Sequence, residues 1–339
     1  MRGSSVLATI DPLFDDDGVA IIALARRATR YRTYSSHEKI ESDIGDGLFQ
    51  RHDSVVNFLR TGGRHGRTDL AGTQLLARTS YFREEYAYDG IPLTEGIESF
   101  LHHDRLLAGA RSVHRRPVIE PSIAYANVML PGQELAVHTD VPEFRGLNRK
   151  RVPQWLLVVM HHSGLFDASR LPIATGVSWF SGGAGGELSL WPTGPDGECV
   201  VHAARPNTAI VLDTDTVFHG VDPVGGPTIE PPPVTGDAEL RRLDDAGGRW
   251  LLVDTTSGEE RATYDWDELR LSVSWKAYCF GDEADRESWR THRDDLSEDV
   301  VIDTLIADLV ARGLVGPDPA RDGALGALMI ETYVRYPSP

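Results

Sequence analysis

Cysteine, long apolar runs and net positive charge are what this sequence lacks. Its 339 residues include only Cys199 and Cys279, too few for a disulfide framework, and this scarcity favours a reducing compartment such as the cytoplasm. No run approaches the roughly 18 apolar residues of a membrane span, and residues 1–5 lack the apolar core of a secretion signal. With 34 basic and 51 acidic residues the net charge is −17, so neither nucleic acid nor an anionic membrane is an expected partner.

Short β-rich runs separated by glycine and proline fill the middle of the chain. Hydrophobic residues make up 41% of the sequence, enough for a sizeable core. Strands are expected at 119–129, 134–137, 154–160, 187–191, 199–203, 209–213, 250–254, 261–264 and 269–280. Strands of this length and spacing indicate a sandwich or a barrel.

Helices are expected on both sides of this β region. They are predicted at 19–27, 53–59, 73–86, 94–109 (with Thr94 as N-cap), 299–312 and 324–333. The first 115 residues should therefore be mostly helical. Residues 224–248, rich in Pro, Gly and Asp, are predicted to form a long surface insertion, and 256–258 the tip of a hairpin.

The stretch from Tyr125 to Asp140 organises the rest of the chain. It combines an expected strand, a Pro-Gly turn at 131–132, a second strand and then His138-Thr-Asp140. Side chains at i and i+2 of an extended backbone point the same way, so His138 and Asp140 should aim at one point. A distant apolar run ends at His219, which fits as a third ligand. Two histidines and a carboxylate leave open positions on an octahedral metal, the arrangement that suits non-haem Fe(II) oxygenases.

The order of these motifs resembles the Fe(II)/2-oxoglutarate-dependent oxygenase superfamily. The resemblance covers roughly residues 121–280. It rests on a strand, His138-x-Asp140, Gly-Gly-Glu-Leu at 185–188, a further strand, His219-Gly-Val-x-Pro-Val, and then Arg270-x-Ser272 on a strand.

The resemblance implies a mixed α/β protein with a mainly-β core, a double-stranded β-helix or jelly roll with flanking N- and C-terminal helices. Residues 118–281 would form the catalytic core, with the insertion at 224–248. Residues 1–117 and 282–339 would form helical regions packed around it. The terminal helices are also candidates for a homodimer interface.

The resemblance also implies the cofactors. His138, Asp140 and His219 would bind Fe(II), and 2-oxoglutarate and O₂ would take the remaining positions. The reaction would oxidise, and most simply hydroxylate, an unactivated C–H bond of a small-molecule substrate such as a secondary metabolite, with release of succinate and CO₂. Halogenases of the family replace the carboxylate ligand with a small residue, and Asp140 argues against that activity.

Arg270 is the expected anchor for the distal carboxylate of 2-oxoglutarate, because a guanidinium matches a carboxylate with two parallel hydrogen bonds. Ser272 and Ser274 share its face of an alternating strand, and that face points either to solvent or into a polar barrel interior. Tyr125 and Asn127 are candidates for hydrogen bonds to 2-oxoglutarate or substrate, or for an ordinary barrel-wall face.

Candidates for substrate binding are fewer. Arg145 begins a basic cluster that continues at 149–151, which would receive a substrate anion or form a solvated loop. Trp155 is a candidate for either a substrate contact or the core. The pairs His102-His103 and His161-His162 place adjacent rings on opposite faces of a strand and are interpreted as structural or surface residues.

Three alternatives remain open at this point. The 51-residue gap between His219 and Arg270 leaves Arg249 and Arg261 as other possible anchors, although neither is followed by x-Ser. A cupin-type metalloenzyme would share the jelly roll without using 2-oxoglutarate. A non-catalytic jelly-roll binding protein would use neither metal chemistry nor 2-oxoglutarate.

Overall fold

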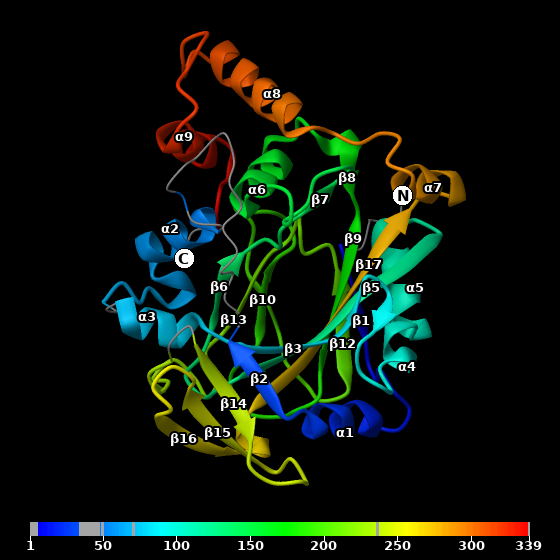
Figure 1. Cartoon of the computed structure of the whole chain (residues 1–339), viewed down its shortest axis with the longest axis vertical. Helices are drawn as coiled ribbons and strands as arrows, with labels where there is room; N and C mark the ends of the chain where they lie inside the picture. Colours follow the sequence, from blue (N-terminus) through cyan, green and yellow to red (C-terminus); the bar gives the residue numbers. More distant parts are fainter. Residues whose placement is uncertain (1–5, 34–47, 49–50, 70–71, 235–236, 338–339) are drawn as a thin grey trace.

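The computed structural model describes residues 6–33, 48, 51–69, 72–234 and 237–337, and antiparallel sheets dominate it (Figure 1). The largest sheet of the described part has 11 strands. Across the sheet they are β1 (Leu7–Ile10), β12 (Thr208–Leu212), β9 (Ile173–Trp179), β17 (Arg270–Phe280), β5 (Val118–Met129), β3 (Phe82–Tyr88), β2 (Arg30–Thr33), β14 (Ala238–Arg242), β15 (Arg249–Asp254) and β16 (Glu260–Asp265), with β4 (Ile91–Pro92) beside β3.

A smaller sheet faces the middle of the large one. Its order is β11 (Val200–His202), β10 (Leu188–Trp191), β13 (Phe218–Val221) and β6 (Leu135–His138), and β7 (Glu143–Phe144) pairs separately with β8 (Arg170–Leu171). Buried apolar side chains from both sheets form one cluster, which includes Met129, Trp179, Leu188, Ile210, Leu212 and Val221. The inner faces of the two sheets therefore pack against each other.

Helices α4 (Glu98–Leu101) and α5 (Asp104–His114) cover the outer face of the large sheet, on the right of Figure 1. Gly109 lets α5 approach β12 closely, because a Cβ there would lie 2.8 Å from Val211 Cγ2. Trp275 of β17 is buried on this outer face and its Nε1 donates to the Leu101 carbonyl at 2.7 Å. Successive residues of a strand point to opposite faces, so the residues next to Trp275, and every second residue before them along β17, must point inward between the sheets.

A helix from the middle of the chain and two C-terminal helices form a second apolar cluster at the upper end of Figure 1. Helices α6 (Gln154–Ser163), α8 (Glu298–Ala311) and α9 (Gly323–Tyr333) contribute its buried side chains, and α7 (Glu283–Arg290) lies beside β17. The other elements are α1 (Val19–Arg27), α2 (His52–Thr61), α3 (Gly72–Thr79) and the 3₁₀ turns Gly63–His65, Asp167–Ser169 and Trp266–Glu268. No helix in the described part is both long and apolar enough to cross a bilayer.

The strand predicted at 154–160 is wrong, because this run is the first part of helix α6. All seven residues of the run are buried, so its hydrophobicity has no period that would separate a buried helix from a buried strand. Pro153 precedes the helix, and Gly164 ends it with φ = 70°. A proline before the run and a glycine after it are compatible with a helix and with a strand, so they do not distinguish the two.

The prediction of a mostly helical first third is also wrong. Strands β1 to β4 come from this region and join the large sheet. The predicted helix 73–86 ends at Thr79 and gives way to β3. The predicted helix 94–109 is two helices, and His103 rather than Thr94 caps the longer one, its Nδ1 accepting from the Arg105 backbone at 3.3 Å.

The predicted insertion at 224–248 contains a strand rather than only surface loop. Strand β14 pairs with β15 and with β2, which extends the large sheet at the lower end of Figure 1. One of its two partners, β2, is far away in the sequence, so a local sequence pattern did not indicate this strand. The hairpin tip at 256–258 is confirmed, with Gly258 at φ = 72° donating to the Asp254 carbonyl at 2.8 Å.

The C-terminal cluster predicts which residues of α8 support stability. Leu305 is fully buried, whereas Val300 on the same helix is 51% exposed. We expect Leu305→Ala to lower the free energy of unfolding by about 2–5 kcal/mol, and Val300→Ala to change it by less than about 0.5 kcal/mol. Urea denaturation of both variants measures this. Equal effects would contradict the burial of Leu305 in this apolar cluster.

Candidate metal centre

Two neighbouring strands of the small sheet set the two histidines side by side. Strands β6 and β13 are antiparallel with His138 directly opposite His219, so both side chains lie on one face, with ring centroids 4.3 Å apart. Asp140 follows β6, where its backbone N–H donates to the Thr214 carbonyl at 2.8 Å. Its Oδ1 lies 3.6 Å from His138 Nε2 and 3.8 Å from His219 Nε2. The three predicted ligands therefore come together, with one donor atom from each within 4.8 Å of the others.

Both imidazoles are held in the form that binds a metal. His138 Nδ1 lies 2.7 Å from the Ala136 carbonyl, and His219 Nδ1 lies 2.9 Å from the Val217 carbonyl. A carbonyl oxygen can only accept, so each Nδ1 carries a hydrogen and Nε2 is the nitrogen left to face a metal. Burial, together with the neighbouring His138, lowers the pKa of His219 to about 4. His219 is therefore neutral at pH 7, as a ligand must be.

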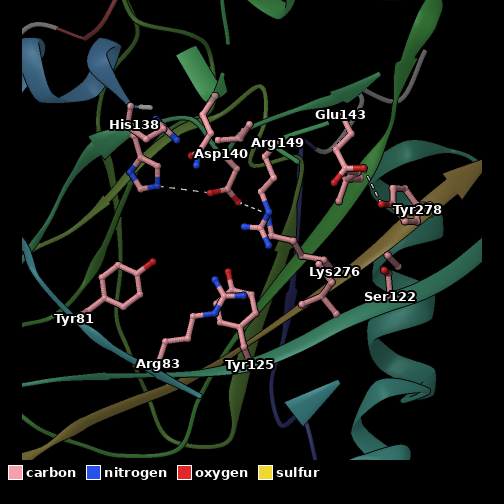
Figure 2. Close-up of a pocket in the computed structure, with 16 residues that line it drawn as sticks. Tyr81, Arg83, Ser122, Tyr125, His138, Asp140, Glu143, Arg149, Lys276 and Tyr278 are labelled. Carbon is pink, nitrogen blue, oxygen red and sulfur yellow. Dashed lines mark hydrogen bonds and ion pairs between the residues drawn. The ribbon is translucent and has the colours of Figure 1, made fainter. Parts of the chain in front are cut away.

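A lysine that the sequence analysis missed completes the centre. Lys276 Nζ donates to Asp140 Oδ2 at 2.7 Å (Figure 2), and the two side chains are only 17% and 21% exposed. Burial opposes ionisation of Asp140, but Lys276 and the two histidines outweigh it and hold the pKa of Asp140 well below its usual value. Lys276 occupies one carboxylate oxygen and leaves the other toward the histidines. Continuing the alternation of Arg270 and Ser272 along β17 would have identified it.

The inner cavity, as we call the space between the two sheets, links these residues to Arg270. It has a volume of about 80 Å³. Its polar lining comes from both sheets: Tyr81, Tyr125, Asn127, His138, Asp140, Thr175, Thr214, His219, Arg270, Ser272 and Ser274. Arg270, Ser272 and Ser274 therefore face the interior rather than solvent.

Arg270 has hydrogen-bonding capacity to spare inside this cavity. It is 7% exposed, its Nε donates to the Gly186 carbonyl at 2.8 Å, and its Nη1 lies 3.3 Å from Ser272 Oγ. Its Nη2 is buried and has no hydrogen-bond partner among the described residues. Burial lowers the pKa of Arg270 to about 10, so the guanidinium stays charged at pH 7. A buried cationic N–H without a partner indicates a missing acceptor.

Gly186 explains the Gly-Gly-Glu-Leu motif. Its φ is 72°, and a Cβ there would lie 2.6 Å from Arg270 Cδ, so only glycine lets the guanidinium pass. Asn127 also faces the inner cavity, where its Nδ2 donates to Ser274 Oγ at 3.2 Å. The alternative anchors do not line it: Arg249 is 63% exposed on its side chain and Arg261 bonds to Glu259.

A second cavity, the outer cavity, lies on the other side of His138 and Asp140, and its lining is drawn in Figure 2. Its volume is about 130 Å³. Four residues line both cavities: Tyr81, Tyr125, His138 and Asp140. The candidate metal position is therefore accessible from two directions.

Two predicted substrate residues lie elsewhere. Arg145 pairs with Asp285 and, at 3.1 Å, with Asp294, and it lines neither the inner nor the outer cavity. Trp155 is 1% exposed in the apolar cluster of the C-terminal helices, which makes it a core residue. The basic cluster instead reaches the outer cavity through Arg149. The loop that carries both arginines has no periodicity, so the sequence could not tell which of them turns inward.

The histidine pairs lie outside both cavities. His161 and His162 belong to α6, where burial lowers their pKa values to about 3 and about 4. His162 stacks on Phe218 with ring centroids 5.4 Å apart. His103 caps α5, and His102 is exposed. Their interpretation as structural or surface residues agrees with these positions.

Comparisons with known proteins give similarities of fold only. No family model matches the sequence, and no curated protein matches it. Among solved structures, it is similar to the alpha ketoglutarate dependent epimerase SnoN from nogalamycin biosynthesis (10% identity, TM-score 0.41, 81% of this chain and 79% of that one). A Pseudomonas putida prolyl-4-hydroxylase (11%, 0.31, 77% and 98%) and HygX from Streptomyces hygroscopicus with nickel, 2-oxoglutarate and hygromycin B (11%, 0.36, 81% and 84%) are also similar. Likenesses at this level do not define a family.

The pair between Lys276 and Asp140 can be tested without metal. Lys276→Met keeps a side chain of similar length but leaves the Asp140 carboxylate without its cation. We therefore expect the free energy of unfolding to fall by up to about 3 kcal/mol. Asp140→Asn together with Lys276→Met should cost less than the sum of the two single changes, because neither charge is then left alone. Urea unfolding of the four proteins in EDTA measures the coupling. Additive effects would show that the pair contributes nothing.

Proposed function

We propose that this protein is an Fe(II)/2-oxoglutarate-dependent oxygenase with a double-stranded β-helix core, acting on a C–H bond of a small molecule. The observation that carries the proposal is the inner cavity, which joins two histidines and a carboxylate at one end to a charged, partly unpartnered Arg270 at the other. A dicarboxylate that binds a metal through one end needs these two features at opposite ends of one cavity. The two facing antiparallel sheets are what a double-stranded β-helix requires.

The donor set fits ferrous iron. His138, Asp140 and His219 offer two imidazole nitrogens and one carboxylate oxygen, the set that non-haem Fe(II) oxygenases use. With 2-oxoglutarate and O₂, bound Fe(II) would supply an oxidant for a C–H bond, with succinate and CO₂ as co-products. Hydroxylation is the simplest outcome of that oxidation. Asp140 fills the position that a halogenase would leave to halide.

The roles of the protein's own residues follow from their contacts. Arg270 and Ser272 would bind the distal carboxylate of 2-oxoglutarate. Asn127, which also lines the inner cavity, would add a polar contact to 2-oxoglutarate. Lys276 would hold Asp140 through one oxygen, so that the carboxylate can offer only the other to the metal. The apolar side chains between the sheets, such as Leu188 and Val221, would keep bulk water out.

Two other functions make different predictions. A cupin-type metalloenzyme would use the three ligands without 2-oxoglutarate, and it gives no reason for a buried Arg270. A non-catalytic binding protein gives no reason for the arrangement of the ligands. Oxygen-free Fe(II) protein should develop a weak visible charge-transfer band when 2-oxoglutarate is added, and oxygen should then be consumed with release of succinate. Absence of the band would favour a cupin, and absence of succinate a binding protein.

Arg270→Ala is the decisive variant. Loss of a charge-assisted hydrogen-bond pair is worth about 1.5–3 kcal/mol, so we expect the Kd for 2-oxoglutarate to rise at least about tenfold. Fe(II) affinity should not change, because Arg270 lies at the other end of the inner cavity.

Titration of the charge-transfer band measures both affinities. Arg270→Lys keeps the charge and should restore part of the loss, which separates an anchoring role from a folding defect. Arg249→Ala removes an exposed arginine near in sequence and serves as the matched control. An equal loss in Arg249→Ala, or none in Arg270→Ala, would contradict the assignment.

A further inference from the structure

We propose that the outer cavity binds an oxyanion of the substrate, a carboxylate or a phosphate, between Arg83 and Arg149. The chemistry at the metal rests on the function proposed above, but the anion site rests on its own residues. Figure 2 shows the guanidinium groups of Arg83 and Arg149 directed from opposite sides into the same space, below Asp140. Arg83 comes from β3 and Arg149 from the loop after β7, so only the tertiary structure brings them together.

The lining of the outer cavity has the opposite charge to the chain as a whole. Its cationic side chains are those of Arg51, Arg83, Arg149 and Lys276. Among the described residues, the carboxylates that line it are those of Asp140 and Glu143, in a chain of net charge −17. Cavities lined by one sign of charge concentrate ligands of the other sign. The cavity therefore selects for an anion that the acidic surface would otherwise repel.

Two of these cations support neighbouring elements of the fold. Lys276 pairs with Asp140, and Arg51 lies 3.3 Å from Asp53 while its Nη2 donates to the Thr139 carbonyl at 3.1 Å. Those contacts support the metal ligands and the strand end. Arg83 and Arg149 are the two cations whose guanidinium groups Figure 2 shows directed into the cavity from opposite sides.

The side chain of Arg83 is fixed in position by its contacts with Tyr125 and Glu85. Its guanidinium carbon lies 3.6 Å from the centroid of the Tyr125 ring, and its Nη2 donates to Glu85 at 2.9 Å. The Arg83 side chain is 9% exposed, so little side-chain freedom is left to lose on binding. Tyr125 also lines the inner cavity, which puts Arg83 next to the candidate metal position.

The carboxyl group of Glu143 is held in the wall of the outer cavity by a hydrogen bond. Its Oε2 accepts a hydrogen bond from the Tyr278 hydroxyl at 2.8 Å. Burial raises the pKa of Glu143 above its usual value, which favours the neutral form. The nearby cations oppose that shift only in part. Glu143 therefore acts as a hydrogen-bonded wall of the cavity.

A larger cavity gives the rest of the substrate a place. The basin, a cavity of about 400 Å³, shares Ile123, Glu143, Arg149 and Tyr278 with the outer cavity, so Arg149 stands where the two meet. Tyr88 and Trp289 line the basin, and Lys150 Nζ lies 4.3 Å from the Tyr88 ring centroid. The combined space fits a small molecule that has an oxyanion near the metal and an aromatic or apolar part beyond it.

Calorimetric titration with matched probes tests the anion site. Benzoate and phenyl phosphate are the oxyanion probes, and benzamide and phenol are their neutral counterparts. The protein is loaded with Fe(II) and saturating 2-oxoglutarate without oxygen, so the inner cavity is already filled. We expect at least one oxyanion to bind at least about tenfold more tightly than its neutral counterpart. The two oxyanions together decide between a carboxylate and a phosphate.

Variants locate the site. Arg149→Ala should weaken oxyanion binding at least about tenfold, and Arg149→Lys should recover part of it. Arg249→Ala is the control, because its side chain is 63% exposed and it lines neither the inner cavity, the outer cavity nor the basin. It should change binding less than about twofold. Thermal unfolding of each variant checks that the fold is intact.

Several results would overturn the proposal. These are equal binding of benzoate and benzamide, tighter binding of phenethylamine, equal losses in Arg149→Ala and Arg249→Ala, or displacement of the probe by additional 2-oxoglutarate. The proposed oxygenase function fails separately: without a charge-transfer band or succinate, the anion site can still be present. A normal band with no oxyanion binding would reject the anion site alone.

Discussion

The ion pair between Asp140 and Lys276 is the interaction on which the site depends, because it joins the two sheets. Asp140 extends from β6 of the small sheet and Lys276 points inward from β17, near the centre of the large sheet. A largely buried ion is stable only with its partner, so the carboxylate is held in one place even before a metal binds. The pair also divides the interior, with the inner cavity on one side and the outer cavity on the other.

Strand β17 shows how one strand serves both the core and the site. Its outward residues Leu271, Val273 and Trp275 are fully buried against the helices, and Trp275 is fixed by its hydrogen bond to the Leu101 carbonyl. Its inward residues, from Arg270 to Lys276, supply polar groups to the cavities. A shift of one residue in its register would exchange the two sets. The apolar packing of the outer face therefore fixes the position of every cation on the inner face.

Positively charged side chains gather in the two cavities of this acidic protein, although they come from different segments of the chain. Acidic side chains dominate the sequence, but the two cavities near the candidate metal position collect arginine and lysine from β3, β17 and the loop after β7. Such side chains are tolerated in a half-buried cavity because carboxylates, carbonyls and an aromatic ring hold most of them. The same arrangement makes the site selective for anions.

Local periodicity in the sequence was enough to put His138 and Asp140 on one side, to group Arg270, Ser272 and Ser274 on one face of β17, and to predict α8 and α9. Each of these depends on strand alternation or helical spacing within one segment. Periodicity failed for α6, whose uniformly buried run has no period, and for β14, β1 and β2, each of which pairs with at least one strand distant in the chain. Lys276 was within reach of the alternation argument, whereas the choice of Arg149 over Arg145 was not. A loop side chain takes its direction from the surfaces on which the loop packs, and those surfaces come from segments far apart in sequence. The sequence by itself determined which chemical groups share a strand face, and only the tertiary structure decided which of those faces meet.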